Sequence, residues 1–197
     1  MQILKATASN ILTASQTVKK GGLVVYPTET VYGLGCSPFH AEAVRRVFEV
    51  KGLRKKPLPI LASDIEQVGK IAHVPKKARR IAEEFWPGPL TLVLLKKTTL
   101  PNAITCNMDS VGVRIPCHIV AAQLIRLSDG LLVGTSANKT GEEPPRTAHE
   151  AAEQLGEEVD VILDGGPTLL GAPSTIVNLT SEEPMILREG PLSLKEI

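Results

Sequence analysis

The chain has 197 residues, 43% of them apolar, so it can bury a sizeable core without a disulfide or metal staple. Its 22 Lys and Arg nearly balance its 21 Asp and Glu, so no global charge points to a nucleic acid or a membrane as partner. Cys36, Cys106 and Cys117 show no CxxC spacing, which argues against a disulfide framework or a zinc site and favours buried free thiols.

The N-terminus, MQILKATASN, lacks the apolar region of a signal peptide. No apolar run approaches the ~20 residues that a membrane-spanning helix needs. We therefore expect a cytoplasmic protein without a membrane partner.

Apolar runs typical of strands alternate with segments of helical periodicity, which predicts a single α/β domain over residues 1–197 with helices covering the sheet. A helix is predicted over residues 9–20, with Ser9 as N-cap and Gly21 and Gly22 as its end. Further helices are expected at residues 41–50, 75–85 (Pro75 in its first turn), 118–127 and 148–155.

Strands are predicted where short runs are rich in Val, Ile and Leu. Such composition suits central strands that are buried on both faces. The predicted strands cover residues 23–26, 58–61, 91–95, 112–115, 131–135, 161–163, 175–178 and 185–187.

Polar side chains gather where several of these strands end. The stretch VVYPTETVYGLG (24–35) leaves a strand and presents Thr28, Glu29 and Thr30, and GTSANKTGEEPP (134–145) follows another strand. Arg114 lies in a strand, while Ser174 and Arg188 flank two others. Open α/β sheets place ligand crevices at such positions, so these residues are predicted to line one.

Each segment also has a purely structural interpretation. Thr, Ser and Asn near turns commonly bond their own backbone. Arg114 can pair with Glu29 or another buried carboxylate instead of with a ligand.

Two basic segments stand out in a chain of balanced charge. The segment KGLRKKPLPIL (51–61) fits either an exposed loop or a cradle for a polyphosphate. Residues 76–80 fit either a solvated helix face or a contact with the RNA backbone. The chain has no GxxxxGK[ST], GxGxxG, HExxH or GxSxG pattern, and its four histidines form no metal-binding pattern.

Seven segments taken in order resemble the YrdC-like family of threonylcarbamoyl-AMP synthases. They cover nearly the whole chain: YPTETVYGLG (26–35), KG with PL nearby (51–58), WPGPLTLVL (86–94), VGVRIP (111–116), TSAN with a later G (135–141), PSTIV (173–177) and LREG (187–190).

The resemblance implies a twisted, mixed α/β sheet with a deep, positively charged cleft. It also implies a reaction in which L-threonine, bicarbonate and ATP give threonylcarbamoyl-AMP and pyrophosphate, without a protein nucleophile. Mg²⁺ would arrive on the ATP phosphates, with no metal site in the protein and no tightly bound organic cofactor. Threonylcarbamoyl-transferase proteins would then modify tRNA, and binding of tRNA or double-stranded RNA to this chain is possible.

By the same resemblance, threonine would be held by Thr30, Arg114, Gly134 and Ser174. Lys51 and Arg54 would act on the phosphates as the catalytic cations. The full ATP site would comprise Lys51, Arg54, Lys56, Ser110, Ser136, Asn138, Pro144 and Arg188.

The chain departs from the synthase pattern at two positions. Leu53 stands where synthases have an arginine, so that Arg54 or Lys56 is expected to reach the phosphate, and Leu61 replaces a histidine. Both features resemble the YciO-like branch. Two alternatives therefore stay open: an RNA-binding protein without this catalysis, and carbamoyl-adenylate chemistry on another amine.

Overall fold

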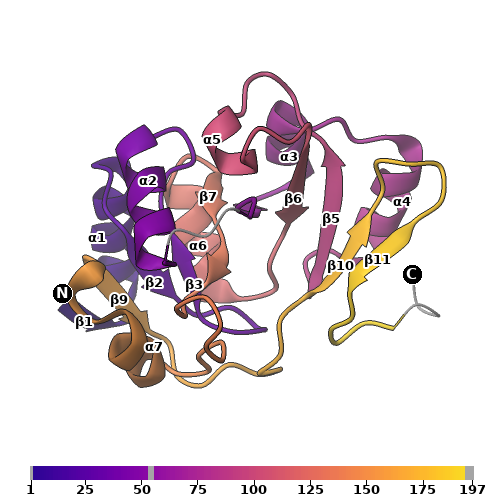
Figure 1. The fold of residues 1–197 in the computed structure, drawn as a ribbon. Helices are drawn as coiled ribbons and strands as arrows, with labels where there is room; N and C mark the ends of the chain where they lie inside the picture. The colour runs from indigo at the N-terminus through magenta and orange to yellow at the C-terminus, as the bar shows by residue number, and fades with distance from the viewer. Residues whose placement is uncertain (1, 53–55, 194–197) are drawn as a thin grey trace.

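Two mixed β-sheets form the frame of the protein in the computed structural model, which describes residues 2–52 and 56–193. Figure 1 shows the sheets side by side, with helices packed around them. The first sheet has the strand order β1-β9-β2-β3-β8, and the second has the order β11-β10-β5-β6-β4-β7.

The first sheet pairs the N-terminal strand with a strand more than 150 residues later. Parallel pairing connects β1 (Gln2–Lys5), β9 (Val161–Asp164) and β2 (Val24–Tyr26), and antiparallel pairing adds β3 (Gly33–Gly35) and β8 (Thr135–Ser136). Successive side chains of β2 point to opposite faces, so Val24 and Tyr26 enter one apolar cluster and Val25 enters another. The sheet is therefore buried on both faces.

Helices cover each face of this first sheet. Helices α1 (Ala8–Lys19) and α6 (Ile119–Leu127) share one apolar cluster with Val24 and Tyr26. Helices α2 (Ala41–Val50) and α7 (Ala148–Leu155) contribute to the cluster on the other side.

Helices pack mainly on one face of the second sheet, and on the other face Leu61 and Leu132 pack with α6. Its strands are β11 (Met185–Arg188), β10 (Thr175–Asn178), β5 (Leu90–Leu95), β6 (Ser110–Arg114), β4 (Ile60–Ala62) and β7 (Leu131–Val133). Leu92, Leu94 and Val113 pack in the core with α3 (Ile65–Ile71) and α4 (Lys76–Phe85). The alternate residues of β5 and β6 are thereby directed away from that core.

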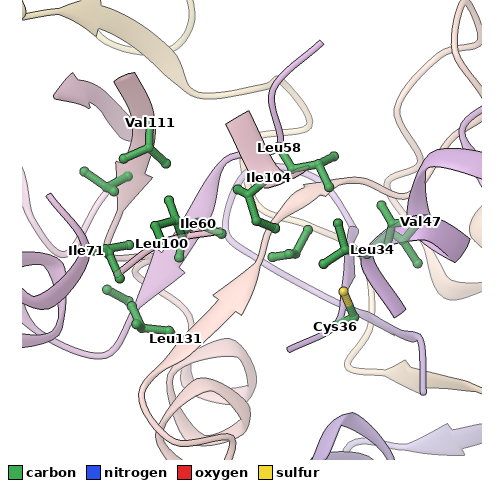
Figure 2. Close-up of a cluster of buried hydrophobic side chains, with 14 of the residues drawn as sticks. Leu34, Cys36, Val47, Leu58, Ile60, Ile71, Leu100, Ile104, Val111 and Leu131 are labelled. Carbon is green, nitrogen blue, oxygen red and sulfur yellow. The ribbon is translucent and has the colours of Figure 1, made fainter. Parts of the chain in front are cut away.

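The chain crosses from the second sheet to the first at Gly134, between β7 and β8. The Gly134 N–H donates to the Pro59 carbonyl at 2.9 Å, and the Val133 N–H donates to the Cys36 carbonyl at 3.0 Å. Figure 2 shows that one apolar cluster runs through this region, from Leu34 and Cys36 to Leu58 and beyond. The two sheets therefore share a core.

Several expectations from the sequence need correction. The strand predicted over residues 131–135 is split into β7 and β8 because the chain changes sheets. The strand β11 lies at an edge with Met185 and Leu187 more than half exposed, so it is not a central strand. Thr7 rather than Ser9 caps α1, and Pro75 is the N-cap of α4 rather than part of its first turn.

The sequence did not predict β1, β3, α3 or α5 (Asn102–Thr105), nor the short 3₁₀ helix at Gly156–Glu158. The cysteines also differ from expectation: Cys36 is buried, Cys106 is partly buried and Cys117 is exposed. Within the described residues, the helices are too short or too polar to cross a membrane.

Candidate active site

A pocket of about 380 Å³ opens on the face of the second sheet that lies opposite α3 and α4, next to the first sheet. Its walls come from both sheets and from the connection between β9 and β10, which runs from one sheet to the other (Figure 1). The lining residues fall within the segments 28–33, 56–61, 91–93, 108–114, 134–136, 173–176 and 187–188.

The charged residues of this lining are all cationic. Lys56, Arg114 and Arg188 line the pocket, and none of the lining residues in the described chain is an Asp or a Glu. Ser, Thr and Tyr hydroxyls supply most of the remaining polar groups. The described residues contain no cluster of three or more His, Cys, Asp or Glu that could hold a metal ion. This lining suits an anionic ligand.

The floor of the pocket follows from the two-residue period of the strands. Ser110, Gly112 and Arg114 alternate along β6 and face the same way as Thr91 and Val93 of β5. Gly112 has no side chain, so the floor is open between Ser110 and Arg114.

Arg114 is held on three sides by groups of the protein. Its Nε–H donates to the Gly88 carbonyl at 3.0 Å, and its Nη1–H donates to Thr30 Oγ1 at 3.0 Å. Its Nη2 lies 2.7 Å from Glu29 Oε1, an ion-pair distance at which the N–H is not aligned for a hydrogen bond. These two hydrogen bonds use the Nε–H and one N–H of Nη1, so one N–H of Nη1 remains, while Nη2 is buried against Glu29.

The turn after β2 brings Thr30 to this guanidinium. The Thr28 hydroxyl donates to the Val31 carbonyl at 2.7 Å and accepts from the backbone N–H groups of Thr30 and Val31. A hydroxyl has one hydrogen, so in the 2.8 Å contact between the two side chains Thr30 is the donor and Thr28 the acceptor. Thr30 also accepts from Arg114, which leaves one lone pair for a ligand.

A second polar group forms where β10 begins. The hydroxyls of Thr91 and Ser174 lie 2.8 Å apart, and Arg188 Nη2 donates to the Ser174 carbonyl at 2.7 Å and to its hydroxyl at 3.2 Å. When Thr91 is the donor of that pair, Ser174 keeps its hydrogen for a ligand oxygen. This group therefore offers both an O–H and a guanidinium to an anion.

Lys51 lies behind the wall rather than in the lining. Only 1% of the residue is exposed, and its ammonium donates to the Ser136 carbonyl at 2.7 Å and to the carbonyl and Oδ1 of Asn138. The Thr140 hydroxyl donates to the Lys51 carbonyl at 2.6 Å. Lys51 thus holds the segment after β8 in place.

Tyr32 also lines the pocket, and its hydroxyl donates to the Gly166 carbonyl at 2.7 Å. Burial raises the pKa of Tyr32 to about 12. The phenol is therefore neutral near pH 7 and is not suited to remove a proton from a ligand.

The structure brings together most of the site residues that were predicted from the sequence. Thr30, Arg114, Gly134 and Ser174 line the pocket, as do Lys56, Ser110, Ser136 and Arg188. Lys51, Asn138 and Pro144 are not among the lining residues, and Arg54 lies outside the described residues.

Sequence reasoning missed Thr91, Val93, Met108, Ile176 and Leu187, which also line the pocket. The available signal was the spacing of two residues between Thr91 and Val93 and between Ser174 and Ile176. The Val, Ile and Leu content of these segments hides this signal, because it predicts strands that are buried on both faces.

The Sua5_yciO_yrdC family model, described as telomere recombination, matches residues 16–190 of the chain. The threonylcarbamoyl-AMP synthase of Pyrococcus abyssi is 44% identical over 186 residues, which cover 93% of this chain and 55% of that protein. The chain therefore spans little more than half the length of this relative.

Two solved structures are similar to the whole fold. The crystal structure of P. abyssi Sua5 complexed with L-threonine has a TM-score of 0.97 at 40% identity, and the match covers 100% of this chain and 59% of the Sua5 chain. The crystal structure of E. coli YciO has a TM-score of 0.91 at 26% identity, and the match covers 99% of this chain and 98% of the YciO chain.

Proposed function

The chain belongs to the Sua5, YciO and YrdC family, and from this membership we propose that its pocket makes threonylcarbamoyl-AMP and pyrophosphate from L-threonine, bicarbonate and ATP. The observation that carries the proposal is the pocket lining, which combines three cations with several hydroxyls and contains no carboxylate in the described residues. All reactants except the amino acid are anions, and the amino acid carries a carboxylate. The site thus favours the charges that this reaction must assemble.

Threonine fits the end of the pocket at Arg114. The remaining N–H of Arg114 Nη1 and the Ser174 hydroxyl suit its carboxylate. The free lone pair of Thr30 Oγ1 suits an N–H of its amine. Gly134 and Leu61 then form the adjoining wall.

ATP fits the part of the pocket lined by Lys56, Ser110, Ser136 and Arg188. Lys51 supports this wall through Ser136 and Asn138, and Pro144 belongs to the segment that follows. Arg54 stays a prediction for the phosphates. Mg²⁺ would be carried on the phosphate oxygens, which requires no carboxylate cage from the protein and neutralises part of their charge.

The chemistry requires the protein to position groups rather than to form a covalent bond. The neutral threonine amine forms a bond to the carbon of bicarbonate, and water is lost to leave a carbamate. A carbamate oxygen then attacks the α-phosphorus, and pyrophosphate leaves as the bond between the α-phosphorus and the bridging oxygen breaks. Alignment of the two reactants and stabilisation of the charge that develops on phosphate oxygens provide the rate enhancement. Arg188 and Lys56 are placed to contribute to that stabilisation.

Transfer of the product to tRNA by a downstream transferase, and direct contact of this chain with tRNA or double-stranded RNA, stay predictions. A role in tRNA modification implies that the protein works in the cytoplasm, where tRNA is modified.

The test is an assay with purified protein, ATP, Mg²⁺, isotopically labelled bicarbonate and single amino acids. We expect release of pyrophosphate that depends on threonine, and a threonylcarbamoyl-AMP product that carries the label by mass spectrometry. Omission of bicarbonate is the control. Labelled product with a different amino acid only would support another amine, and no adenylate with any amino acid would reject the proposal.

A further inference from the structure

The Glu29 side chain is a buried carboxylate for which the reaction described above has no use. Only 6% of the residue is exposed, and among the described residues neither carboxylate oxygen has a hydrogen-bond partner. Its backbone carbonyl accepts from the Leu170 N–H at 2.9 Å, which fixes the residue without occupying the carboxylate. A buried carboxylate without donors is unfavourable, so its ion pair with Arg114 is the interaction that offsets this cost.

The charge of Arg114 is therefore largely cancelled before any ligand arrives. Both side chains are 7% exposed and their charged atoms are 2.7 Å apart, so water screens the pair little. His118 also interacts with Glu29, and burial lowers the pKa of His118, which keeps this imidazole neutral near pH 7. His118 thus adds no positive charge to compensate Glu29.

Arg114 Nη2 is buried against Glu29, so a ligand carboxylate would bind on the Nη1 side of the guanidinium, which faces Thr30. An oxygen on Nη1 and an oxygen on Nη2 are separated by roughly 5–7 Å, given hydrogen bonds of about 2.8 Å, so this carboxylate would lie close to Glu29. A simple carboxylate gains hydrogen bonds at this position but meets a like charge. An amino acid brings its own ammonium group, which Glu29 attracts.

We propose that Glu29 is a specificity-determining residue, which cancels the charge of Arg114 so that the pocket prefers a zwitterionic amino acid to a carboxylate without an ammonium group. The inference rests on the proposed function, because it assumes that Arg114 receives the amino-acid carboxylate. It also gives a reason for a carboxylate in this position. A pocket lined by three cations would otherwise bind small anions such as inorganic phosphate in place of the amino acid.

The test compares two ligands that differ only in the amine. L-threonine and 2,3-dihydroxybutanoate, its analogue with a hydroxyl in place of the amine, are titrated into the wild-type protein and into Glu29→Gln by calorimetry. In the wild type we expect threonine to bind at least about tenfold more tightly. In Glu29→Gln we expect this ratio to fall about tenfold, mainly because the analogue binds more tightly.

A second ion pair of the chain provides a matched control. Asp160 is paired with Arg46 at an N–O distance of 3.1 Å and accepts from the Leu23 N–H, and neither Asp160 nor Arg46 lines the pocket. Asp160→Asn therefore removes one carboxylate charge that faces an arginine without changing a residue of the site. The ligand ratio should not change in this variant. Glu29→Asp keeps the charge and should keep most of the preference for threonine.

The outcomes separate the inference from the proposed function. A folded Glu29→Gln protein with the wild-type ratio of the two ligand affinities would overturn the inference. A wild-type protein that binds both ligands equally would also overturn it. This second measurement needs no variant, so it can be made even if Glu29→Gln does not fold. A wild-type protein that binds neither threonine nor another amino acid would instead reject the proposed function.

Discussion

The Lys51 ammonium donates to the Ser136 carbonyl at 2.7 Å, and this contact joins the end of α2 to the pocket wall 85 residues later. The lysine is almost fully buried, and Asn138 supplies two further acceptors. Lys51 therefore acts on the pocket through the chain segment that it holds.

We expect Lys51→Ala to lower both stability and ATP affinity. The substitution leaves three buried acceptors without their donor, which should lower the free energy of unfolding by about 2–4 kcal/mol. Chemical denaturation and ATP titration of the folded fraction measure the two effects. Lys139→Ala is the control, because the Lys139 side chain is about half exposed and its pair with Glu158 should contribute little. A Lys51→Ala protein with wild-type stability would contradict the structural role.

Arg114→Lys should lower both the stability of the protein and its affinity for the amino acid. The lysine keeps the charge but loses the planar fork that reaches Gly88, Thr30 and Glu29 together. We expect a lower melting temperature and a loss of about 1–3 kcal/mol in amino-acid binding, with little change in ATP affinity. Thermal melts and separate titrations of amino acid and ATP measure these quantities. Amino-acid affinity that stays at the wild-type value in the folded protein would remove Arg114 from the site.

Helical periodicity allowed the amphipathic helices to be predicted well. Helix α2 spans Ala41–Val50 and helix α7 spans Ala148–Leu155, the ranges that the sequence predicts. Strand β1 (Gln2–Lys5) was missed because it is short and mostly exposed and carries no buried apolar run. Its existence depends on β9, more than 150 residues away, and pairing over such a distance leaves no local signal.

The site was predictable where one strand or turn supplies the residue. Thr30, Arg114 and Ser174 line the pocket, and Arg114 pairs with Glu29, the carboxylate that the sequence offers as its structural partner. The burial of Lys51 was not predictable, since it depends on acceptors that tertiary folding brings to the end of α2. The crossing of the chain between the two sheets was not predictable either, because the sequence around Gly134 predicts one continuous apolar strand.

Gly134→Ala should destabilise the crossing between the two sheets. A Cβ atom at this position would lie 2.3 Å from Leu61 Cγ and 2.9 Å from both of its methyl carbons, well inside van der Waals contact. Leu61 is buried, so the overlap should cost about 1–3 kcal/mol of unfolding free energy.

The double variant Gly134→Ala with Leu61→Ala tests the cause of this loss. Removal of the Leu61 side chain opens the space that the new methyl group needs, so the two effects should be less than additive by about 1 kcal/mol or more in denaturation experiments. Simple additivity would show that the strain at Gly134 arises elsewhere.

The last prediction concerns the pH dependence of strand β1. Lys5 Nζ lies 2.6 Å from Asp164 Oδ2, and the Gly166 N–H donates to Asp164 Oδ1 at 3.0 Å. The hydrogen bond from Lys5 is the main cause that lowers the pKa of Asp164, with a smaller contribution from the Gly166 N–H. The Lys5 contact holds the end of β1 to the C-terminal end of β9, whereas the Gly166 contact lies within the segment that follows β9.

A carboxyl whose pKa is lowered by folding stabilises the protein when it is ionised in both states. The contribution is therefore complete above the ordinary Asp pKa of about 4 and is lost as the pH falls through the lowered pKa of the folded protein. Because the Lys5 side chain is 81% exposed, solvent screening limits the contribution to at most about 1 kcal/mol. Asp164→Asn should thus be less stable than wild type at pH 7, and the difference should shrink steadily as the pH is lowered below about 4. Denaturation of both proteins across this range, at low and at high salt, measures it. If the difference in unfolding free energy between the two proteins is the same at pH 7 and in strong acid, the ionised Asp164 carboxylate does not stabilise the contact between β1 and β9.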